Sequence, residues 1–126
     1  MKKRVLVVDD ETAFLRILKL NLEGTGNYEV LTLPGAEDIL AHLRAFKPDI
    51  ILLDIIMSGT KGLDVCEMLN KDPDGARIPI IILSALDKAA DKLLAFKIGA
   101  VDYLVKPMGK EELIEKIEKA LRAKDL

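Results

Sequence analysis

Four charged residues stand where short apolar runs end, and side chains in such places can assemble a reactive site. They are Asp9, Asp10, Asp54 and Lys106. The apolar runs that precede them span residues 4–8, 49–53 and 101–105. Burying charge is costly unless opposite charges pair or a metal ion is bound. We therefore expect three carboxylates and one ammonium group to share a single site.

The elements that must position this site are indicated by the hydrophobic pattern. Apolar runs rich in β-branched residues predict five strands, at residues 4–8, 28–33, 49–53, 79–83 and 101–105. The stretches between them repeat apolar residues at the i, i+3, i+4, i+7 spacing of a helix. The helical stripes are Phe14, Ile17, Leu18 and Leu22; Ala36, Ile39, Leu40 and Leu43; Val65, Met68 and Leu69; Ala90, Leu93, Leu94 and Ile98; and Leu113, Ile117, Ala120 and Leu121.

The alternation of strands and helices predicts the fold class. The first, third and fourth strands are apolar at almost every position, as in parallel strands covered on both faces. We therefore expect a doubly wound α/β sheet of five parallel strands and five helices, with right-handed crossovers. Ligands of such sheets bind beyond the carboxyl ends of the strands. Because Asp9, Asp10, Asp54, Ser84 and Lys106 lie at or just after those ends, the fold should gather them in one cleft.

The composition argues against several classes of function. A chain of 126 residues is expected to form one domain, residues 1–126. A net charge of −2 and the lack of tryptophan argue against direct nucleic acid binding. No apolar stretch approaches the roughly 20 residues that span a bilayer, and Asp9 and Asp10 interrupt the run that resembles a signal peptide. We expect a cytoplasmic protein, with no membrane partner, whose single cysteine, Cys66, fills the core.

Four motifs point to a protein family. Val-Val-Asp-Asp ends at Asp10, Ile-Leu-Leu-Asp at Asp54, Ile-Ile-Ile-Leu-Ser-Ala at Ala85, and Asp-Tyr-Leu-Val-Lys-Pro at Pro107. In this order and at these separations they closely resemble the receiver domain of bacterial two-component response regulators, such as the single-domain chemotaxis regulators. The resemblance implies a flavodoxin-like fold with sheet order 2-1-3-4-5.

The same resemblance implies a signalling switch. A sensor histidine kinase or a phosphotransfer protein would phosphorylate one aspartate, and the signal would pass to a downstream output protein or a fused output domain. The chain would not be an enzyme, because it would catalyse only its own phosphorylation and dephosphorylation. The responding surface would be the fourth helix, the fifth strand and the fifth helix, roughly residues 87–122.

A magnesium site around the phosphate acceptor is also implied. Asp54 matches the acceptor, Asp10 the direct acidic ligand of Mg²⁺, and Asp9 its neighbour, which acts through metal-bound water. The backbone carbonyl of Ile56 matches the third protein ligand. Mg²⁺ prefers hard oxygen ligands, so these groups suit it.

Further positions match residues that serve the phosphoryl group. Ser84 matches the hydroxyl that reaches it, and Lys106 matches the cation that bonds it. Tyr103 matches the aromatic switch residue that moves with Ser84, although it could instead be a rim aromatic with a solvated hydroxyl. The Lys106–Pro107 bond matches a cis peptide, which is adopted at low cost only before proline.

Two apolar residues occupy positions that, in this family, control how long the phosphoryl group survives. These are Ile56 and Leu86, and we expect them to exclude water and to slow autodephosphorylation. The chain departs from the family where Met57-Ser58 replaces the usual Met-Pro. That change is expected to loosen the loop without altering the chemistry.

Other functions on a related fold need residues that this chain lacks. A phosphatase with an aspartate nucleophile, of the haloacid dehalogenase type, needs an acid two positions after the nucleophile, where this chain has Ile56. A flavodoxin needs a hydroxyl-rich phosphate loop after the first strand, but here Asp9, Asp10 and Glu11 would repel phosphate. A docking module independent of phosphorylation would have lost a site residue, and none is missing. The phosphatase and the docking module are the alternatives to a phosphorylation switch.

Overall fold

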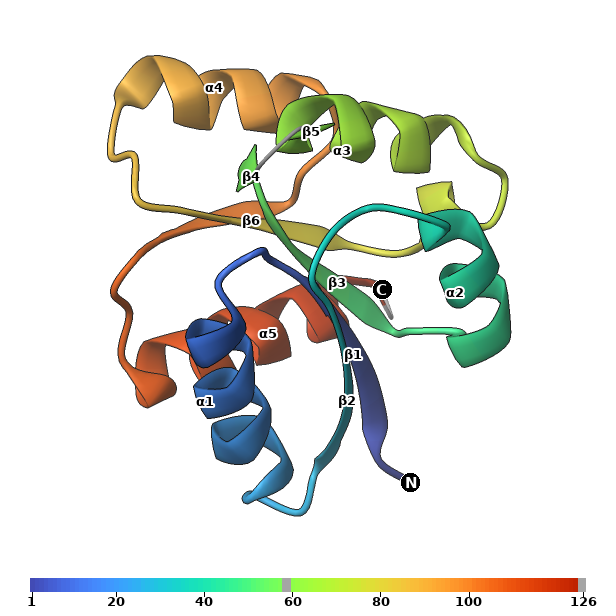
Figure 1. The fold of residues 1–126 in the computed structure, drawn as a ribbon, viewed down its shortest axis with the longest axis vertical. Coiled ribbons are helices and arrows are strands. Elements are labelled where there is room, and N and C mark those ends of the chain that lie inside the picture. Colours follow the sequence, from blue (N-terminus) through green and yellow to red (C-terminus); the bar gives the residue numbers. More distant parts are fainter. Residues whose placement is uncertain (58–59, 125–126) are drawn as a thin grey trace.

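A five-stranded parallel sheet forms the centre of the computed structural model, which describes residues 1–57 and 60–124. The strand order is β2-β1-β3-β6-β7 (Figure 1), which confirms the expected order 2-1-3-4-5. The strands are β1 (Lys3–Val8), β2 (Tyr28–Leu33), β3 (Ile50–Asp54), β6 (Ile80–Ser84) and β7 (Asp102–Val105). Each observed end lies within one residue of the predicted end, and this small shift makes Asp54 and Ser84 the last residues of their strands.

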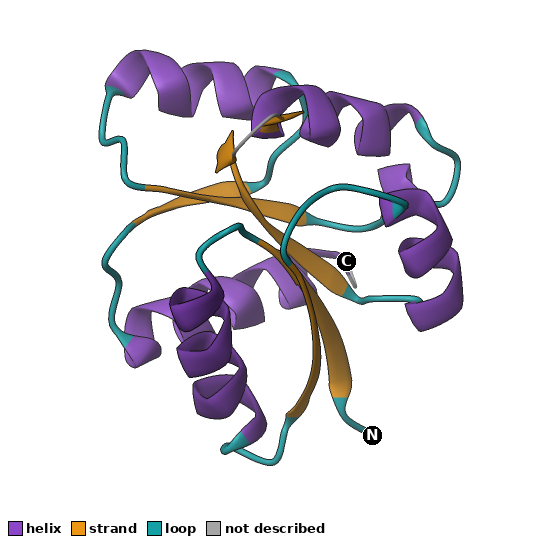
Figure 2. Cartoon of the chain, in the orientation of Figure 1, coloured by secondary structure: helices purple, strands orange, loops and turns teal. Residues whose placement is uncertain are grey.

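Helices cover both faces of the sheet (Figure 2). Helices α1 and α5 lie against one face, and α2, α3 and α4 lie against the other (Figure 1). Their bounds are α1 (Thr12–Glu23), α2 (Ile39–Phe46), α3 (Gly62–Lys71), α4 (Ala89–Lys97) and α5 (Lys110–Lys124), with a short 3₁₀ helix at Gly75–Arg77. The doubly wound α/β class is confirmed.

The sheet separates two hydrophobic cores. Along β1, Leu6 and Val8 point into the core beneath α2, α3 and α4, whereas Val5 and Val7 point into the core beneath α1 and α5. All four are fully buried, and burying such a side chain stabilises the fold by roughly 1.5–3 kcal/mol. Because both faces need apolar residues, the strands carry unbroken apolar runs. The same packing fixes the carboxyl ends of the strands relative to one another.

The face that α4 turns toward the sheet differs from the prediction. Leu93 and Leu94, two members of its apolar stripe, are 62% and 45% exposed, while Ala95 is fully buried. Because apolar residues surround α4 on nearly all sides, their spacing does not select one face. The small Ala95 side chain allows the helix to approach the core closely, which leaves the longer leucines at the surface.

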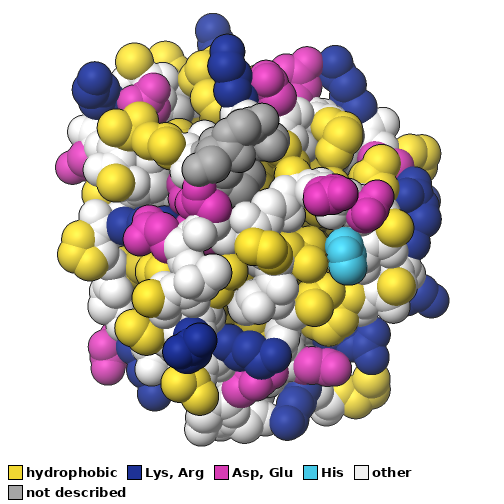
Figure 3. Space-filling model, viewed as in Figure 1, with side chains coloured by type: hydrophobic (Ala, Val, Ile, Leu, Met, Phe, Trp, Pro, Cys, Tyr) yellow, Lys and Arg dark blue, Asp and Glu magenta, His cyan; other side chains and the backbone are white. Residues whose placement is uncertain are grey.

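On the face drawn in Figure 3, hydrophobic side chains and charges of both signs are interspersed.

Two very short strands follow the end of β3 and were not predicted. β4 (Ile56–Met57) pairs with β5 (Thr60–Lys61) in an antiparallel arrangement, and segments of this length carry no detectable periodicity. Ser58, which the sequence marks as a departure from the family, lies outside the described residues. Gly62 then starts α3 where a Cβ atom would lie only 2.2 Å from the carbonyl oxygen of Asp54. Glycine at this position therefore lets α3 begin directly against the strand end that carries Asp54.

Among the described residues, no helix combines the length and the apolar character that crossing a membrane requires.

Candidate functional site

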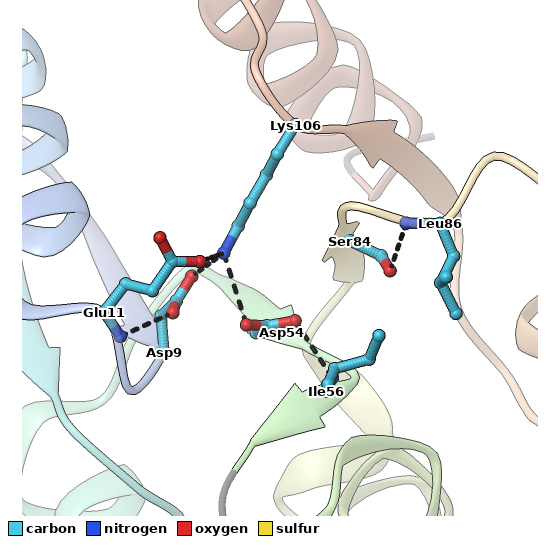
Figure 4. A network of polar contacts seen from close by, with 7 residues as sticks. All are labelled: Asp9, Glu11, Asp54, Ile56, Ser84, Leu86 and Lys106. Carbon is cyan, nitrogen blue, oxygen red and sulfur yellow. Dashed lines mark hydrogen bonds and ion pairs between the residues drawn. The ribbon is translucent and has the colours of Figure 1, made fainter.

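The carboxyl edge of the sheet brings Lys106 together with three carboxylates. Asp9 follows β1, Asp54 ends β3 and Lys106 follows β7, so three separate strand ends contribute (Figure 4). Lys106 Nζ lies 2.5 Å from Asp9 Oδ2, 3.0 Å from Glu11 Oε1 and 3.2 Å from Asp54 Oδ2. The predicted convergence of Asp9, Asp54 and Lys106 is confirmed. Glu11, which was not predicted as a site residue, joins them; its place in the acidic run directly after Asp10 is the signal that could have identified it.

The electrostatics of this cluster favour a bound cation. Asp9 is fully buried, Asp54 is 3% exposed, and the Lys106 side chain is 10% exposed. Oxygen atoms of Asp9, Glu11 and Asp54 lie within 4.8 Å of one another, close enough to hold one metal ion. One ammonium cannot neutralise three carboxylates. Hard oxygen donors in this number suit Mg²⁺, which is commonly held by one or two carboxylates together with water and phosphate oxygens.

Asp10, the predicted direct ligand of the metal, is not one of the three carboxylates of this cluster. It follows Asp9 and is partly buried. Within the described residues, the acidic group that could hold an ion consists of Asp9, Glu11 and Asp54. The role of Asp10 and that of the Ile56 carbonyl as ligands therefore remain predictions.

A repeated local turn orients the side chain at three strand ends (Figure 4). In each turn, a side-chain oxygen accepts a hydrogen bond from the backbone N–H two residues later. The pairs are Asp9 with Glu11 at 2.9 Å, Asp54 with Ile56 at 3.0 Å, and Ser84 with Leu86 at 3.0 Å. The bond fixes one oxygen of each aspartate and leaves its second oxygen directed at Lys106. The backbone thus prepares the site before any ligand arrives.

The ionisation of Asp54 and Lys106 reflects this crowding. Burial is the main reason that the pKa of Asp54 lies above its ordinary value; the N–H of Ile56 and the ammonium of Lys106 oppose the rise, and the Asp9 charge adds to it. Burial also acts to lower the pKa of Lys106, but its hydrogen bonds to Asp9 and Glu11, together with the negative charges of Asp54 and Asp9, outweigh this effect and raise the pKa. Lys106 is therefore firmly cationic, and the charge on Asp54 is held at an energetic cost.

Ser84 and its flanking residues complete the surroundings of Asp54. Ser84 is fully buried at the end of β6, the strand that pairs with β3. The backbone N–H of Lys106 donates to the Ser84 carbonyl at 2.8 Å, which ties the end of β7 to that of β6. The side chains of Ile56 and Leu86 lie next to Asp54 and Ser84 (Figure 4). Ile56 is 52% exposed, so it lies at the open rim of the site.

Tyr103 occupies an inward position on β7. Its side chain is buried, and its hydroxyl donates to the backbone carbonyl of Leu86 at 2.9 Å. This bond connects β7 to the loop after β6, and Lys92 Nζ lies 5.9 Å from the ring centroid. The reading of Tyr103 as a rim aromatic with a solvated hydroxyl does not fit these contacts. Its role as a switch stays a prediction.

Two other expectations from the sequence concern Pro107 and Cys66. The Lys106–Pro107 peptide bond is cis, as the resemblance implied. Cys66 is fully buried within the core beneath α2, α3 and α4, and burial raises the pKa of its thiol to about 11. Such a thiol is protonated at neutral pH and unreactive, which agrees with a packing role.

The sequence as a whole is similar to known response regulators. The profile of the response regulator receiver domain matches residues 5–118. The alkaline phosphatase synthesis transcriptional regulatory protein PhoP of Bacillus subtilis is 36% identical over 126 residues, which cover 100% of this chain and 51% of that protein. The DNA-binding response regulator MtrA of Mycolicibacterium paratuberculosis is 34% identical over 125 residues, covering 99% of this chain and 54% of that protein. The chain thus spans about half the length of these relatives.

Solved structures show the same architecture. A CheY-like response regulator receiver domain protein from Methanospirillum hungatei aligns with a TM-score of 0.89 at 29% identity, covering 99% of this chain and 98% of that one. The BeF3-activated N-terminal receiver domain of Klebsiella pneumoniae RstA aligns with a TM-score of 0.84 at 26% identity, covering 95% of this chain and 99% of that one. The acidic group at the carboxyl edge is typical of the site that such domains use.

Proposed function

We propose that this chain, which belongs to the response regulator receiver domain family, is a phosphorylation switch in which Asp54 accepts the phosphoryl group. As a receiver domain it is a signalling module rather than a conventional enzyme. The observation that carries the proposal is the buried Asp54 carboxylate, which lies 3.2 Å from Lys106 within a cluster of three carboxylates. A carboxylate held in this way is poised to act as a nucleophile once a cation reduces the repulsion around it.

The donor set fits Mg²⁺. We propose that Asp9, Asp10, Asp54 and the Ile56 carbonyl hold the ion, and that Glu11 supports it from the edge of the cluster. When bound, Mg²⁺ neutralises the carboxylates and withdraws charge from the phosphoryl oxygens. The chain's own contribution is to hold the carboxylate oxygens of Asp9 and Asp54 in place through the backbone turns at these two residues.

Transfer needs little covalent help from the protein beyond the nucleophile. An oxygen of Asp54 attacks phosphorus in line, and the bond from phosphorus to the donor breaks with its electron pair left on the donor. The product is an acyl phosphate on Asp54. Lys106 supplies a positive charge to one phosphoryl oxygen. The Ser84 hydroxyl accepts a hydrogen bond from the backbone N–H of Leu86. Its own proton is therefore available to donate to a second phosphoryl oxygen.

The partners follow from the same proposal. A sensor histidine kinase or a phosphotransfer protein supplies the phosphoryl group, and an output protein or a fused output domain reads the result. The output surface is α4, β7 and α5, because Tyr103 on β7 contacts the loop that follows Ser84. A shift of Ser84 toward the phosphoryl group would change the position of that loop and so the packing of Tyr103.

The direct test is the intact mass of the protein after incubation with Mg²⁺ and acetyl phosphate, beside Asp54→Asn under the same conditions. We expect the wild type to gain the mass of one phosphoryl group and the variant to gain nothing. If the wild type is folded and gains no mass from acetyl phosphate or from a phosphorylated histidine phosphotransfer protein, the docking module is favoured instead. Steady turnover of the phosphoryl group from phosphorylated small molecules would favour the phosphatase.

A further inference from the structure

An aromatic ring lies against the ammonium group of Lys106, and the mechanism above gives it no role. Phe14 is in the first turn of α1, and its ring centroid is 4.4 Å from Lys106 Nζ. This separation is well within the roughly 6 Å over which the face of an aromatic ring attracts a cation. Phe14 is partly buried and the Lys106 side chain is 10% exposed, so water screens the contact only weakly.

The hydrogen bonds of Lys106 must change during phosphoryl transfer, whereas the ring contact need not. An ammonium group has three donors, and those of Lys106 are directed to Asp9, Glu11 and Asp54. Two of these three carboxylates, Asp9 and Glu11, lie after β1 and compete with Asp54 for the ammonium. At least one donor has to move to a phosphoryl oxygen on Asp54. The attraction to a ring face uses no donor and has little directional demand.

We propose that Phe14 positions Lys106 for phosphoryl transfer by holding its ammonium beside Asp54 while the hydrogen bonds exchange. The inference rests on the proposed function and adds a residue to its machinery. Phe14 acts through Lys106, so it is a positioning residue. Without the ring, the flexible lysine stem would be held at this edge only by the carboxylates that compete with the phosphoryl group.

Phe14 also packs against other apolar groups, and a test must separate the two roles. It lines a cavity of about 500 Å³ between α1 and α5 together with Ile17, Met108 and Leu113. A residue that only packs there can be replaced by another apolar side chain of similar size. A residue that attracts a cation needs the negative face of its ring.

Three replacements of Phe14 distinguish these roles. Phe14→Leu keeps an apolar side chain and removes the ring, and Phe14→Tyr keeps the ring. Pentafluorophenylalanine at this position nearly keeps the shape of the ring but makes its face positive, so the ring no longer attracts a cation. Ile17→Ala is the matched control, because Ile17 lines the same cavity and is 60% exposed. Cooperative thermal unfolding of each variant verifies that it is folded.

The first readout is the rate constant for phosphorylation by saturating acetyl phosphate, measured with the apparent dissociation constant for Mg²⁺. We expect Phe14→Tyr and Ile17→Ala to react at the wild-type rate, Phe14→Leu to be slower by about fivefold, and the fluorinated protein to be slower still. The Mg²⁺ constant should be unchanged, because Phe14 offers no oxygen ligand. A wild-type rate in Phe14→Leu, or a rate in Phe14→Tyr as low as in Phe14→Leu, would overturn the proposal.

The second readout needs neither metal nor phosphate. The ring current of Phe14 should shift the Lys106 Hε proton resonances upfield in the metal-free wild type and in Ile17→Ala, and the shift should disappear in Phe14→Leu. If the wild type is phosphorylated but shows no such shift, the positioning role is wrong and the proposed function stands. If the shift is present and Asp54 is never phosphorylated, the proposed function fails and the positioning role fails with it.

Discussion

The side chains of the site are placed by backbone hydrogen bonds that each of them makes locally. The side-chain oxygens of Asp9, Asp54 and Ser84 each accept a hydrogen bond from the backbone N–H two residues later. Their positions are therefore set by the strand ends rather than by one another. For Asp54 this placement has a cost, because it buries a carboxylate near the Asp9 charge and raises its pKa. The function proposed for this residue is therefore opposed to stability.

The raised pKa of Asp54 predicts how stability depends on pH without metal. In the unfolded chain an aspartate has a pKa of about 3.9, and in the folded protein the value is higher. Between these two pKa values the native state binds more protons than the unfolded state, so stability falls as pH rises. Above both pKa values the full cost is present. Asp54→Asn removes the charge and should therefore stabilise the metal-free protein at a pH where Asp54 is ionised in the folded state.

Urea unfolding between pH 4 and pH 8 in the presence of a chelator measures this effect. The advantage of Asp54→Asn over wild type should be largest at pH 7 and should shrink as the pH falls. Asp64→Asn, at an exposed position of α3, is the control and should show no such trend. An Asp54→Asn protein that is less stable than wild type at pH 7 would contradict the argument.

At the scale of elements, two short segments at strand ends lie beside Asp54, the proposed acceptor. The segment after β3 places Ile56 beside Asp54, and the segment after β6 places Leu86 beside Ser84 (Figure 4). Each segment is also tied to a neighbouring element by a hydrogen bond. The backbone N–H of Gly62 donates to the Ile55 carbonyl at 3.1 Å, and the Tyr103 hydroxyl donates to the Leu86 carbonyl. The loops that we predict to limit access of water are thus the loops that connect the site to α3 and β7.

These two apolar side chains predict a long-lived phosphoryl group. Polar groups in their place could orient an attacking water, so Ile56→Asn/Leu86→Glu should shorten the half-life of phosphorylated Asp54 by about tenfold, which corresponds to roughly 1.4 kcal/mol in the barrier. The measurement is loss of the added phosphoryl mass over time after removal of acetyl phosphate. Ile56→Val/Leu86→Ile keeps both positions apolar and should decay as wild type does. An unchanged or longer half-life in the polar variant would show that these positions do not control water.

At the scale of the whole molecule, the sheet converts distant parts of the sequence into one binding site. Asp9, Asp54 and Lys106 are contributed by β1, β3 and β7, and their relative positions depend on two cores that pack the strands together. A cation held by these carboxylates would therefore link several elements. The exposed leucines of α4 lie on the surface proposed for output, where apolar side chains would gain most from a partner.

Magnesium should accordingly stabilise the whole fold. A ligand that binds only the native state adds about 2.7 kcal/mol when its concentration is 100 times its dissociation constant. We expect the Tm of the wild type to rise with MgCl₂ but not with NaCl of equal ionic strength. Asp9→Asn should lose most of this rise, whereas Asp64→Asn should keep it. An equal rise in NaCl, or a full Mg²⁺ response in Asp9→Asn, would contradict the proposed ligand set.

The sequence alone determined the strands, their order through the family motifs, and the gathering of Asp9, Asp54 and Lys106 at one edge. These features depend on local periodicity and on a general property of parallel sheets, both of which a sequence carries. Only the tertiary structure brought Glu11 and Phe14 against Lys106, because these contacts depend on how the chain turns after β1 into α1 and after β7. It also decided which face of α4 is buried, since apolar residues on nearly all sides of a helix leave that choice to the space that packing provides.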